Sequence, residues 1–401
     1  MILTTLTAAA FDPEAATRAW LATLNGAARA KSDAYFEGGY WLLLWGALVT
    51  VLVSWIELRF GWSAGWSAWA ARVGRRRWLQ PALYALPFIL VGAVLTLPWT
   101  IYTDFVREHQ YGLSNQSFWQ WSGDQLKGLL VNLIVVPLLL IGIFAVIRRS
   151  PKRWWLYGTF VVSAFMLVGT VIAPVFLAPL FNTYKPMAAG PMRDQILAMA
   201  HEQHIPADNV YVFDASKQTK RISANVSGLG PTIRISLNDN LIDRTSPAEV
   251  KAVMGHEMGH YVLGHAWRGL IAITGIVLVM FVLAWWAAPR LLARYGAGWG
   301  VTEVSDPGSL PLLAAIGAVL ALPMTPVLNT VVRTSEAEAD AFGLAAAREP
   351  DGFAAVSMKL SEYRKISPSP LEETLFFDHP SGENRVRRAM QWKAQHLAEA
   401  H

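Results

Sequence analysis

Six runs of about 20 mostly apolar residues constrain this chain more than any other feature, because that length is what a helix needs to cross a bilayer. Apolar residues make up 53% of the 401 residues and charged residues only 16%. The runs cover 39–58, 81–102, 128–147, 155–176, 270–292 and 310–332. Buried helices of a soluble protein are the alternative, but six such runs in one chain favour membrane spans. We therefore expect an integral membrane protein that is mainly α-helical.

Aromatic and basic residues flank these runs. Trp and Tyr gather at the run ends, as expected at a bilayer interface; they include Trp41, Trp55, Trp78, Trp99, Tyr102, Trp154, Trp155, Tyr157, Trp285 and Trp286. The net charge is +5, but the basic clusters 75–77 and 148–153 lie directly beside predicted spans. We interpret them as anchors for lipid headgroups. The lipid bilayer is thus the expected partner of these charges, and nucleic acid is not.

A short motif, His256-Glu257-Met258-Gly259-His260, indicates the chemistry. Two histidines four residues apart on a helix lie on one face and can share a metal ion. A Glu directly after the first His is placed to take a proton from water at that metal. Ser246 and Pro247 predict the start of the helix that carries the motif. The chain has no cysteine, so its zinc ligands would have to be His, Asp or Glu.

A catalytic zinc ion needs three protein ligands and one open position. The candidates for the third ligand are His265, Glu336, Glu338, Asp340 and His379. His265 faces the wrong side of the metal helix unless that helix ends before it. Glu336 and Asp340 are four residues apart and would share a helix face, so one could bind zinc while the other supports a ligating imidazole. A solvated acidic helix face is the alternative.

The pattern divides the chain into five parts. These are an N-terminal surface segment (1–38) with a short amphipathic helix, four spans (39–181), a soluble part with the metal helix (182–267), two further spans (268–332) and a C-terminal helical part with further candidate ligands (333–401). The soluble part should hold a strand at 209–214 and a hairpin of 222–227 with 232–237. Its edge strand could pair with an extended substrate, although an ordinary structural hairpin explains the pattern equally well.

The sequence resembles a known family at these motifs. Residues 253–265 resemble the H-E-[LM]-G-H-x-x-x-x-H signature of the M48 metallopeptidases, and 336–340 resemble their downstream E-x-x-A-D motif. The larger membrane branch of that family, the CAAX prenyl endopeptidases, is similar to this chain at 110–116, 178–186, 223–225 and 379–385. The resemblance implies spans that enclose a chamber, with a small α+β zincin-like metalloprotease domain at its mouth.

The resemblance also implies roles for individual residues. His256, His260 and Glu336 would bind one Zn²⁺, Glu257 would be the general base, Asp340 would orient a ligand, Asn225 would contact the substrate backbone, and His379 and Arg385 would line the catalytic site. Two departures from the family pattern stand out. The family usually has seven spans, but residues 1–38 are too polar for another one here. Many relatives have an aromatic residue after the Asn, where this chain has Val226, so its substrate preference should differ.

We therefore expect a membrane zinc metalloendopeptidase that hydrolyses peptide or protein substrates, including lipidated or membrane-associated ones. One alternative keeps the chemistry but assigns it to quality control of membrane proteins, as in the shorter branch of the family. Another is a transporter or scaffold with structural zinc, but Glu257 argues against it because a structural site has no need of a base.

The basic loop clusters would place the zinc site outside the cytoplasm. The family resemblance implies the reverse, and we expect a cytoplasm-facing site in the inner (plasma) membrane of a bacterium.

Overall fold

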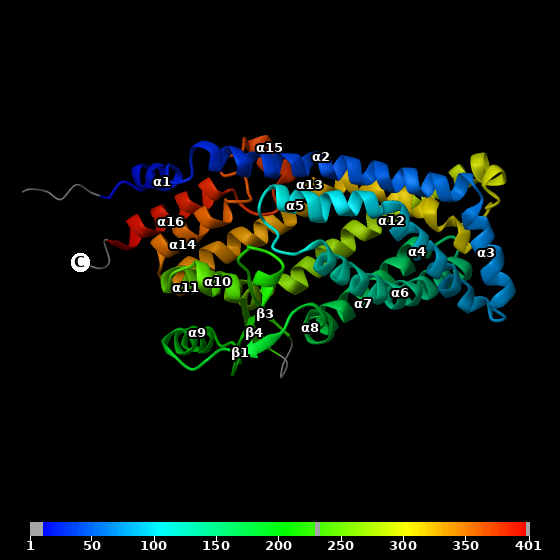
Figure 1. The fold of residues 1–401 in the computed structure, drawn as a ribbon. Helices are drawn as coiled ribbons and strands as arrows, with labels where there is room; N and C mark the ends of the chain where they lie inside the picture. Colours follow the sequence, from blue (N-terminus) through cyan, green and yellow to red (C-terminus); the bar gives the residue numbers. More distant parts are fainter. Residues whose placement is uncertain (1–10, 229–232, 398–401) are drawn as a thin grey trace, which may run out of the picture.

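Long helices form an elongated bundle, and a small sheet with shorter helices covers one end of it (Figure 1). The computed structural model describes residues 11–228 and 233–397. Its α-helices are α1 (Pro13–Leu21), α2 (Gly26–Arg59), α3 (Trp62–Val73), α4 (Gln80–Thr100), α5 (Arg107–Gln110), α6 (Phe118–Arg149), α7 (Trp154–Ile172), α8 (Ala178–Phe181), α9 (Pro191–Glu202), α10 (Asp239–Arg244), α11 (Pro247–Val262), α12 (His265–Trp299), α13 (Leu310–Ala347), α14 (Pro350–Leu360), α15 (Pro370–Phe376) and α16 (Gly382–Leu397).

Within the described residues, six helical segments are long and apolar enough to cross a membrane, which confirms the expected number. They are Gly26–Arg59, Arg77–Gln110, Phe118–Arg149, Trp154–Phe181, His265–Trp299 and Pro307–Ala347. All six are longer than the apolar runs, because a helix continues past the bilayer wherever other elements pack on its polar ends. Residues 26–38, which the sequence assigned to the N-terminal surface segment, thus continue the first long helix, α2. Among the described residues before α2, Pro13–Leu21 form the separate helix α1, which packs on α16.

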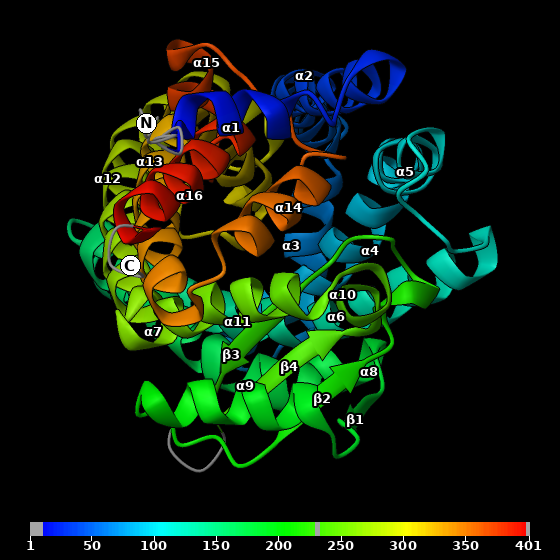
Figure 2. The same ribbon diagram turned by 90° about the vertical axis from the view of Figure 1, so that its left-hand side faces the viewer.

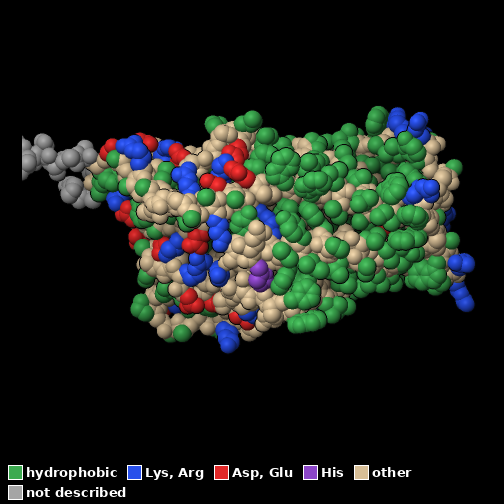
Figure 3. Space-filling model, turned by 45° about the horizontal axis from the view of Figure 1, so that its top comes forward, with side chains coloured by type: hydrophobic (Ala, Val, Ile, Leu, Met, Phe, Trp, Pro, Cys, Tyr) green, Lys and Arg blue, Asp and Glu red, His purple; other side chains and the backbone are tan. Residues whose placement is uncertain are grey.

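On the face drawn in Figure 3, apolar side chains form a belt over the bundle, and most of the charged side chains lie at the end with the sheet. Large apolar side chains in the belt are well exposed, for example Trp41 at 64% and Ile271 at 73%. Such contiguous exposure is stable only in contact with lipid. Further basic side chains lie at the opposite end of the belt in Figure 3. The exposed surface therefore fits an integral membrane protein.

The sheet has four strands in the order β1-β2-β4-β3, formed by β1 (Tyr184–Pro186), β2 (Val210–Phe213), β3 (Ala224–Ser227) and β4 (Arg234–Asn238). β1 pairs antiparallel with β2, β2 pairs parallel with β4, and β3 pairs antiparallel with β4. The predicted hairpin is therefore present as β3 and β4, although its turn at 229–232 lies outside the described residues. β1 was not predicted, because its three residues are too few to show the alternating pattern of a strand. In Figure 2 the sheet lies between α9 and α11, with β3 next to α11.

The metal helix α11 begins as the sequence predicts. The Ser246 hydroxyl accepts a hydrogen bond from the backbone N–H of Glu249, and the Glu249 carboxylate accepts one from the backbone N–H of Ser246, so two free N–H groups are satisfied. α11 then packs tightly on α13. A Cβ added to Gly343 would lie 2.7 Å from the backbone nitrogen of His256, and one added to Gly255 would lie 2.9 Å from the Gly343 carbonyl oxygen. Glycine at both positions thus allows the two backbones to approach.

Candidate metal centre

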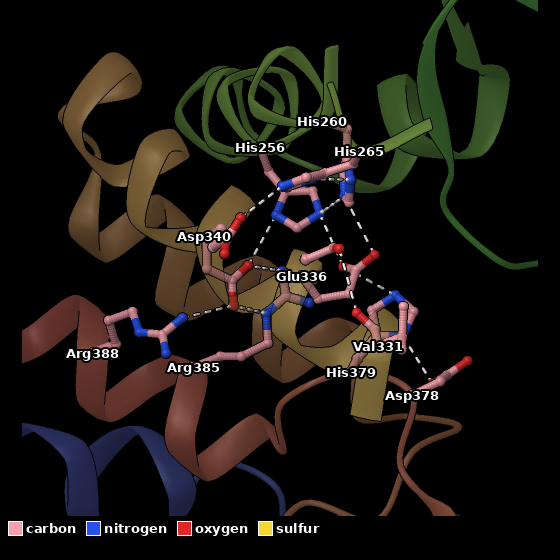
Figure 4. A network of polar contacts seen from close by, with 12 residues as sticks. His256, His260, His265, Val331, Glu336, Asp340, Asp378, His379, Arg385 and Arg388 are labelled. Carbon is pink, nitrogen blue, oxygen red and sulfur yellow. Dashed lines mark hydrogen bonds and ion pairs between the residues drawn. The ribbon is translucent and has the colours of Figure 1, made fainter. Parts of the chain in front are cut away.

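Three of the predicted ligands converge from two helices. His256 and His260 project from α11, and Glu336 projects from α13 (Figure 4). The Nε2 atoms of the two histidines are 3.1 Å apart. Glu336 places Oε2 3.2 Å from Nε2 of His256 and Oε1 3.3 Å from Nε2 of His260. A ligand atom from each of the three lies within 4.8 Å of the others, the spacing of groups that can share one metal ion.

The charges at this point fit a cation. Glu336 is 8% exposed, and its buried Oε2 has no well-aligned hydrogen-bond donor among the described residues, although Nε2 of His256 and Nε2 of His379 each lie 3.2 Å away. Burial lowers the pKa of His256, but the carboxylates of Asp340 and Glu336 outweigh that effect and raise it to about 9. The site therefore favours a positive charge between its imidazoles and carboxylates. A bound metal ion would supply that charge and would satisfy the buried oxygen.

A buried ion pair supports His256 from behind. Its Nδ1 lies 2.9 Å from Oδ1 of Asp340, which is completely buried. Arg385 on α16 donates to both oxygens of Asp340, at 2.5 and 3.1 Å, and Arg388 approaches the same carboxylate at 3.5 Å. This arrangement leaves Nε2 of His256 free to face the metal position. Asp340 thus lies where the predicted orienting role requires.

His265 and Glu338 lie outside the ligand group. The metal helix ends at Val262, so His265 starts α12 and returns toward His260 instead of continuing around α11. Its Nδ1 is 2.9 Å from Nδ1 of His260, and its Nε2 is 3.1 Å from Oε2 of Glu338. Glu338 also receives hydrogen bonds from Arg268. Neither residue belongs to the group of side chains that could share one metal ion, whereas Glu336 does.

Glu257, His379 and Arg385 line a cavity of about 160 Å³ beside the metal group. His256, Glu257, Glu336, His379 and Arg385 all contribute to its wall. Burial raises the pKa of the Glu257 carboxyl, which moves it toward the range in which a general base works near neutral pH. Nε2 of His379 is 3.2 Å from Oε2 of Glu336, and its Nδ1 is held by Asp378 at 2.8 Å. Arg385 is chiefly engaged with Asp340.

A second cavity of about 660 Å³ opens on the other side of the metal group. His260 and Glu336 form part of its wall, and apolar side chains of α7, α12 and α13 form much of the rest. The edge strand β3 passes between the two cavities, because Ala224 lines the smaller one and Val226 lines the larger one. Asn225 lies between them on β3, opposite Ser236 of β4. The structure thus places Asn225 on the sheet edge nearest to the metal helix.

Sequence reasoning missed several residues of this centre. A single glycine inside a helical pattern, such as Gly343, does not indicate a close helix contact. Its role can be recognised only in the folded structure, where the backbone of α11 lies against it. Asp378 and Arg388 are charged residues near the C-terminus without metal-ligand spacing. The position of Asp378 beside His379 was the one available sign, since carboxylates commonly orient functional imidazoles.

Comparison with known proteins identifies the family. Residues 186–393 match the model of peptidase family M48, and residues 19–183 match a model described as the CAAX prenyl protease N-terminal region with five membrane helices. Within 19–183 this chain has four of the long apolar segments and the 12-residue helix α3.

Individual relatives and a solved structure are consistent with these two family matches. The chain is 29% identical over 324 residues to an uncharacterized metalloprotease, YhfN, of Bacillus subtilis, covering 78% of this chain and 76% of the relative. It is 27% identical over 350 residues to a CAAX prenyl protease 1 homolog of Arabidopsis thaliana, covering 84% and 82%. The crystal structure of S. mikatae Ste24p shares the fold, with a TM-score of 0.76 at 19% identity over 94% of each chain. The chain therefore belongs to peptidase family M48, in its membrane-embedded, CAAX prenyl protease-like branch.

Proposed function

We propose that this protein is a zinc-dependent endopeptidase that cuts peptide bonds in lipidated or membrane-associated substrates. The observation that supports it most directly is the group of His256, His260 and Glu336, with Glu257 in the cavity beside it. A structural metal site would need a closed set of ligands and no adjacent base. Three ligands, a base and a cavity match a hydrolytic site instead.

Zinc is the metal that these donors favour. Two imidazole nitrogens and a carboxylate form a common catalytic zinc set, and the chain has no cysteine to offer another. Ligand atoms bound 2.0–2.1 Å from a tetrahedral zinc ion lie about 3.3 Å apart. The two imidazole Nε2 atoms are separated by 3.1 Å, close to that value, and each lies 3.2 or 3.3 Å from a different carboxylate oxygen of Glu336. When bound, the zinc ion would supply Lewis acidity that polarises the scissile carbonyl and acidifies water.

The side chains around the ligands would transfer the proton and contact the substrate. Glu257 takes the proton of the attacking water on its carboxylate and returns it to the leaving amine. His379, held at Nδ1 by Asp378, faces the cavity with Nε2 and would contact the carbonyl oxygen of the substrate. Arg385 adds positive charge to the cavity wall while it holds Asp340 in place.

Two features support the proposed substrate class. β3 is an edge strand, so an extended peptide could add to it beside Asn225 by backbone hydrogen bonds. The 660 Å³ cavity continues from the metal group along the apolar faces of α7, α12 and α13. An apolar chain attached to a peptide would be desolvated there. The relatives named CAAX prenyl protease make a prenylated peptide the first substrate to test.

The decisive experiment compares the wild type with the Glu257→Gln variant in detergent. We expect the variant to keep its zinc and to lose hydrolysis by about 10²–10⁴-fold, the usual contribution of a general base. Each protein should be assayed with a farnesylated CAAX peptide, the same peptide without the lipid, and casein. Unchanged hydrolysis in the variant would overturn the role of Glu257. Cleavage of casein with no preference for the lipidated peptide would favour a quality-control protease.

The proposed orientation places the zinc site on the cytoplasmic side, in the plasma membrane of a bacterium. The family resemblance supports it, while the basic loop clusters argue for the reverse. The absence of cysteine permits a clean test with single introduced cysteines. Lys185→Cys lies at the sheet end and Arg75→Cys at the opposite end, both exposed. An impermeant maleimide applied to intact bacteria should label only the Arg75→Cys variant. Labelling of only the Lys185→Cys variant would reverse the orientation.

A further inference from the structure

We propose that His265 is a positioning residue, which fixes the proton and the ring orientation of the metal ligand His260 through a relay that ends at Glu338. The inference rests on the proposed zinc site. It concerns how the second imidazole is held, and it assigns a function to a histidine that provides no atom to the metal position.

The hydrogen-bond distances determine where each proton lies. A carboxylate can only accept, so the 3.1 Å contact to Glu338 requires the proton of His265 on Nε2. Nδ1 of His265 is then an acceptor, and it lies 2.9 Å from Nδ1 of His260. That contact requires a proton on Nδ1 of His260. Nε2 of His260 is thereby left with a free lone pair, and this nitrogen is the one that faces His256 and Glu336.

A tight turn between two helices brings His265 to this point. Only Leu263 and Gly264 separate α11 from α12, and Gly264 has φ +66°. That conformation suits glycine, and it reverses the chain so that His265 comes back beside His260. His265 is 6% exposed, whereas the side chain of Glu338 is 38% exposed and that of Arg268 is 52% exposed. The relay therefore runs from the buried ligand to the molecular surface.

The two ligating histidines are supported in different ways. His256 faces the buried carboxylate of Asp340 directly, so its imidazole gains negative charge at close range. His260 faces a neutral imidazole, and the nearest carboxylate of its relay, that of Glu338, lies beyond that ring. His265 thus controls the direction and tautomer of His260 more than its charge. Loss of His265 should loosen the metal without removing a ligand.

The test measures zinc release from purified full-length protein when a chelator is added. The His265→Leu variant removes both hydrogen bonds, and we expect release to become about 10–100-fold faster, as for other outer supports of metal ligands. The His265→Gln variant should stay close to the wild type. Its amide oxygen can accept from His260 and its NH₂ group can donate to Glu338. If His265 only filled space, the Leu and Gln variants should retain zinc equally well. Slow release in His265→Gln together with fast release in His265→Leu would therefore indicate that the hydrogen bonds matter.

Two further variants make the test robust. His201→Leu replaces an exposed histidine of α9 and should release zinc at the wild-type rate. Glu338→Ala alters a half-exposed position, so it should fold even if His265→Leu does not, and it should speed release by a smaller factor. Melting temperatures of the chelated proteins show whether the fold is kept. Wild-type rates of zinc release in both His265→Leu and Glu338→Ala would overturn the proposal. A His265→Gln variant that releases zinc as fast as His265→Leu would overturn it as well. Because no substrate is needed, this result is independent of whether the protein cuts peptides.

Discussion

Asp340 shows how strongly single side chains in this centre depend on one another. It is completely buried, and it neutralises Arg385, which is itself only 7% exposed. Removal of one partner of a buried ion pair leaves the other charge without compensation. The charge of Asp340 is therefore as important for the fold of the C-terminal helices as for the orientation of His256.

The Asp340→Asn variant should consequently lose both stability and zinc. We expect destabilisation of about 3–5 kcal/mol, the usual cost of leaving a buried charge unpaired. Thermal unfolding in detergent and zinc content per protein would measure the two effects. Asp351→Asn is the matched control, because its carboxylate pairs with Lys393 at a surface position and is 56% exposed. Equal melting temperatures for the two variants would contradict the importance of the buried pair.

At the level of elements, the contact between α11 and α13 decides whether the metal ligands can meet. The backbones touch where Gly343 faces His256, and a Cβ there would come within 2.7 Å of a backbone nitrogen that cannot move aside. We expect Gly343→Ala to cost about 1–3 kcal/mol by overpacking and to reduce zinc retention. Gly317→Ala is the control on the same helix, since a Cβ at Gly317 meets nothing within 4 Å. A Gly343→Ala protein that binds zinc normally would argue against this close approach.

The capping box of α11 predicts a dependence of stability on pH. Burial would raise the pKa of Glu249, but hydrogen bonds from the Lys359 ammonium and from Ser246 outweigh it and hold the pKa below its ordinary value of 4.5. The ionised carboxylate therefore stabilises the fold above pH 4.5, and this contribution is lost as the pH falls below that value. The Glu249→Gln variant should be less stable at pH 7 and should lose less on acidification. Melting temperatures of both proteins between pH 7 and pH 3.5 would show a constant difference if the expectation is wrong.

For the whole molecule, a metal ion bound as proposed would join the soluble part to the membrane bundle, because α11 carries two of the proposed ligands and α13 carries the third. Zinc removal should therefore lower the melting temperature of the entire protein. Saturation at 100 times the dissociation constant corresponds to about 2.7 kcal/mol of linked stability. A chelator titration followed by zinc addition would measure the loss and its recovery. A His260→Ala variant should show little response, and a response as large as that of the wild type would contradict the assignment.

Much of this architecture follows from local patterns in the sequence. Apolar runs indicate the spans, and the spacing of His256, Glu257 and His260 indicates the metal helix, because both depend on residues close together in the chain. The start of α2 at Gly26 could not be predicted in this way, since tertiary contacts extend that helix beyond its apolar run. The role of Gly343 and the return of His265 likewise depend on where α13 and the Gly264 turn lie in space.

The length of α13 has a consequence for which bonds can be cut. A helix rises about 1.5 Å per residue, so Glu336 lies about 39 Å along the axis from Leu310. The hydrocarbon core of a bilayer is about 30 Å thick. A helix that enters this core near Leu310 carries its metal ligand only about 10 Å beyond the opposite boundary, a distance that about three extended residues can span. We therefore expect the enzyme to prefer scissile bonds within a few residues of a membrane anchor, and to spare the same sequence on a long flexible tether.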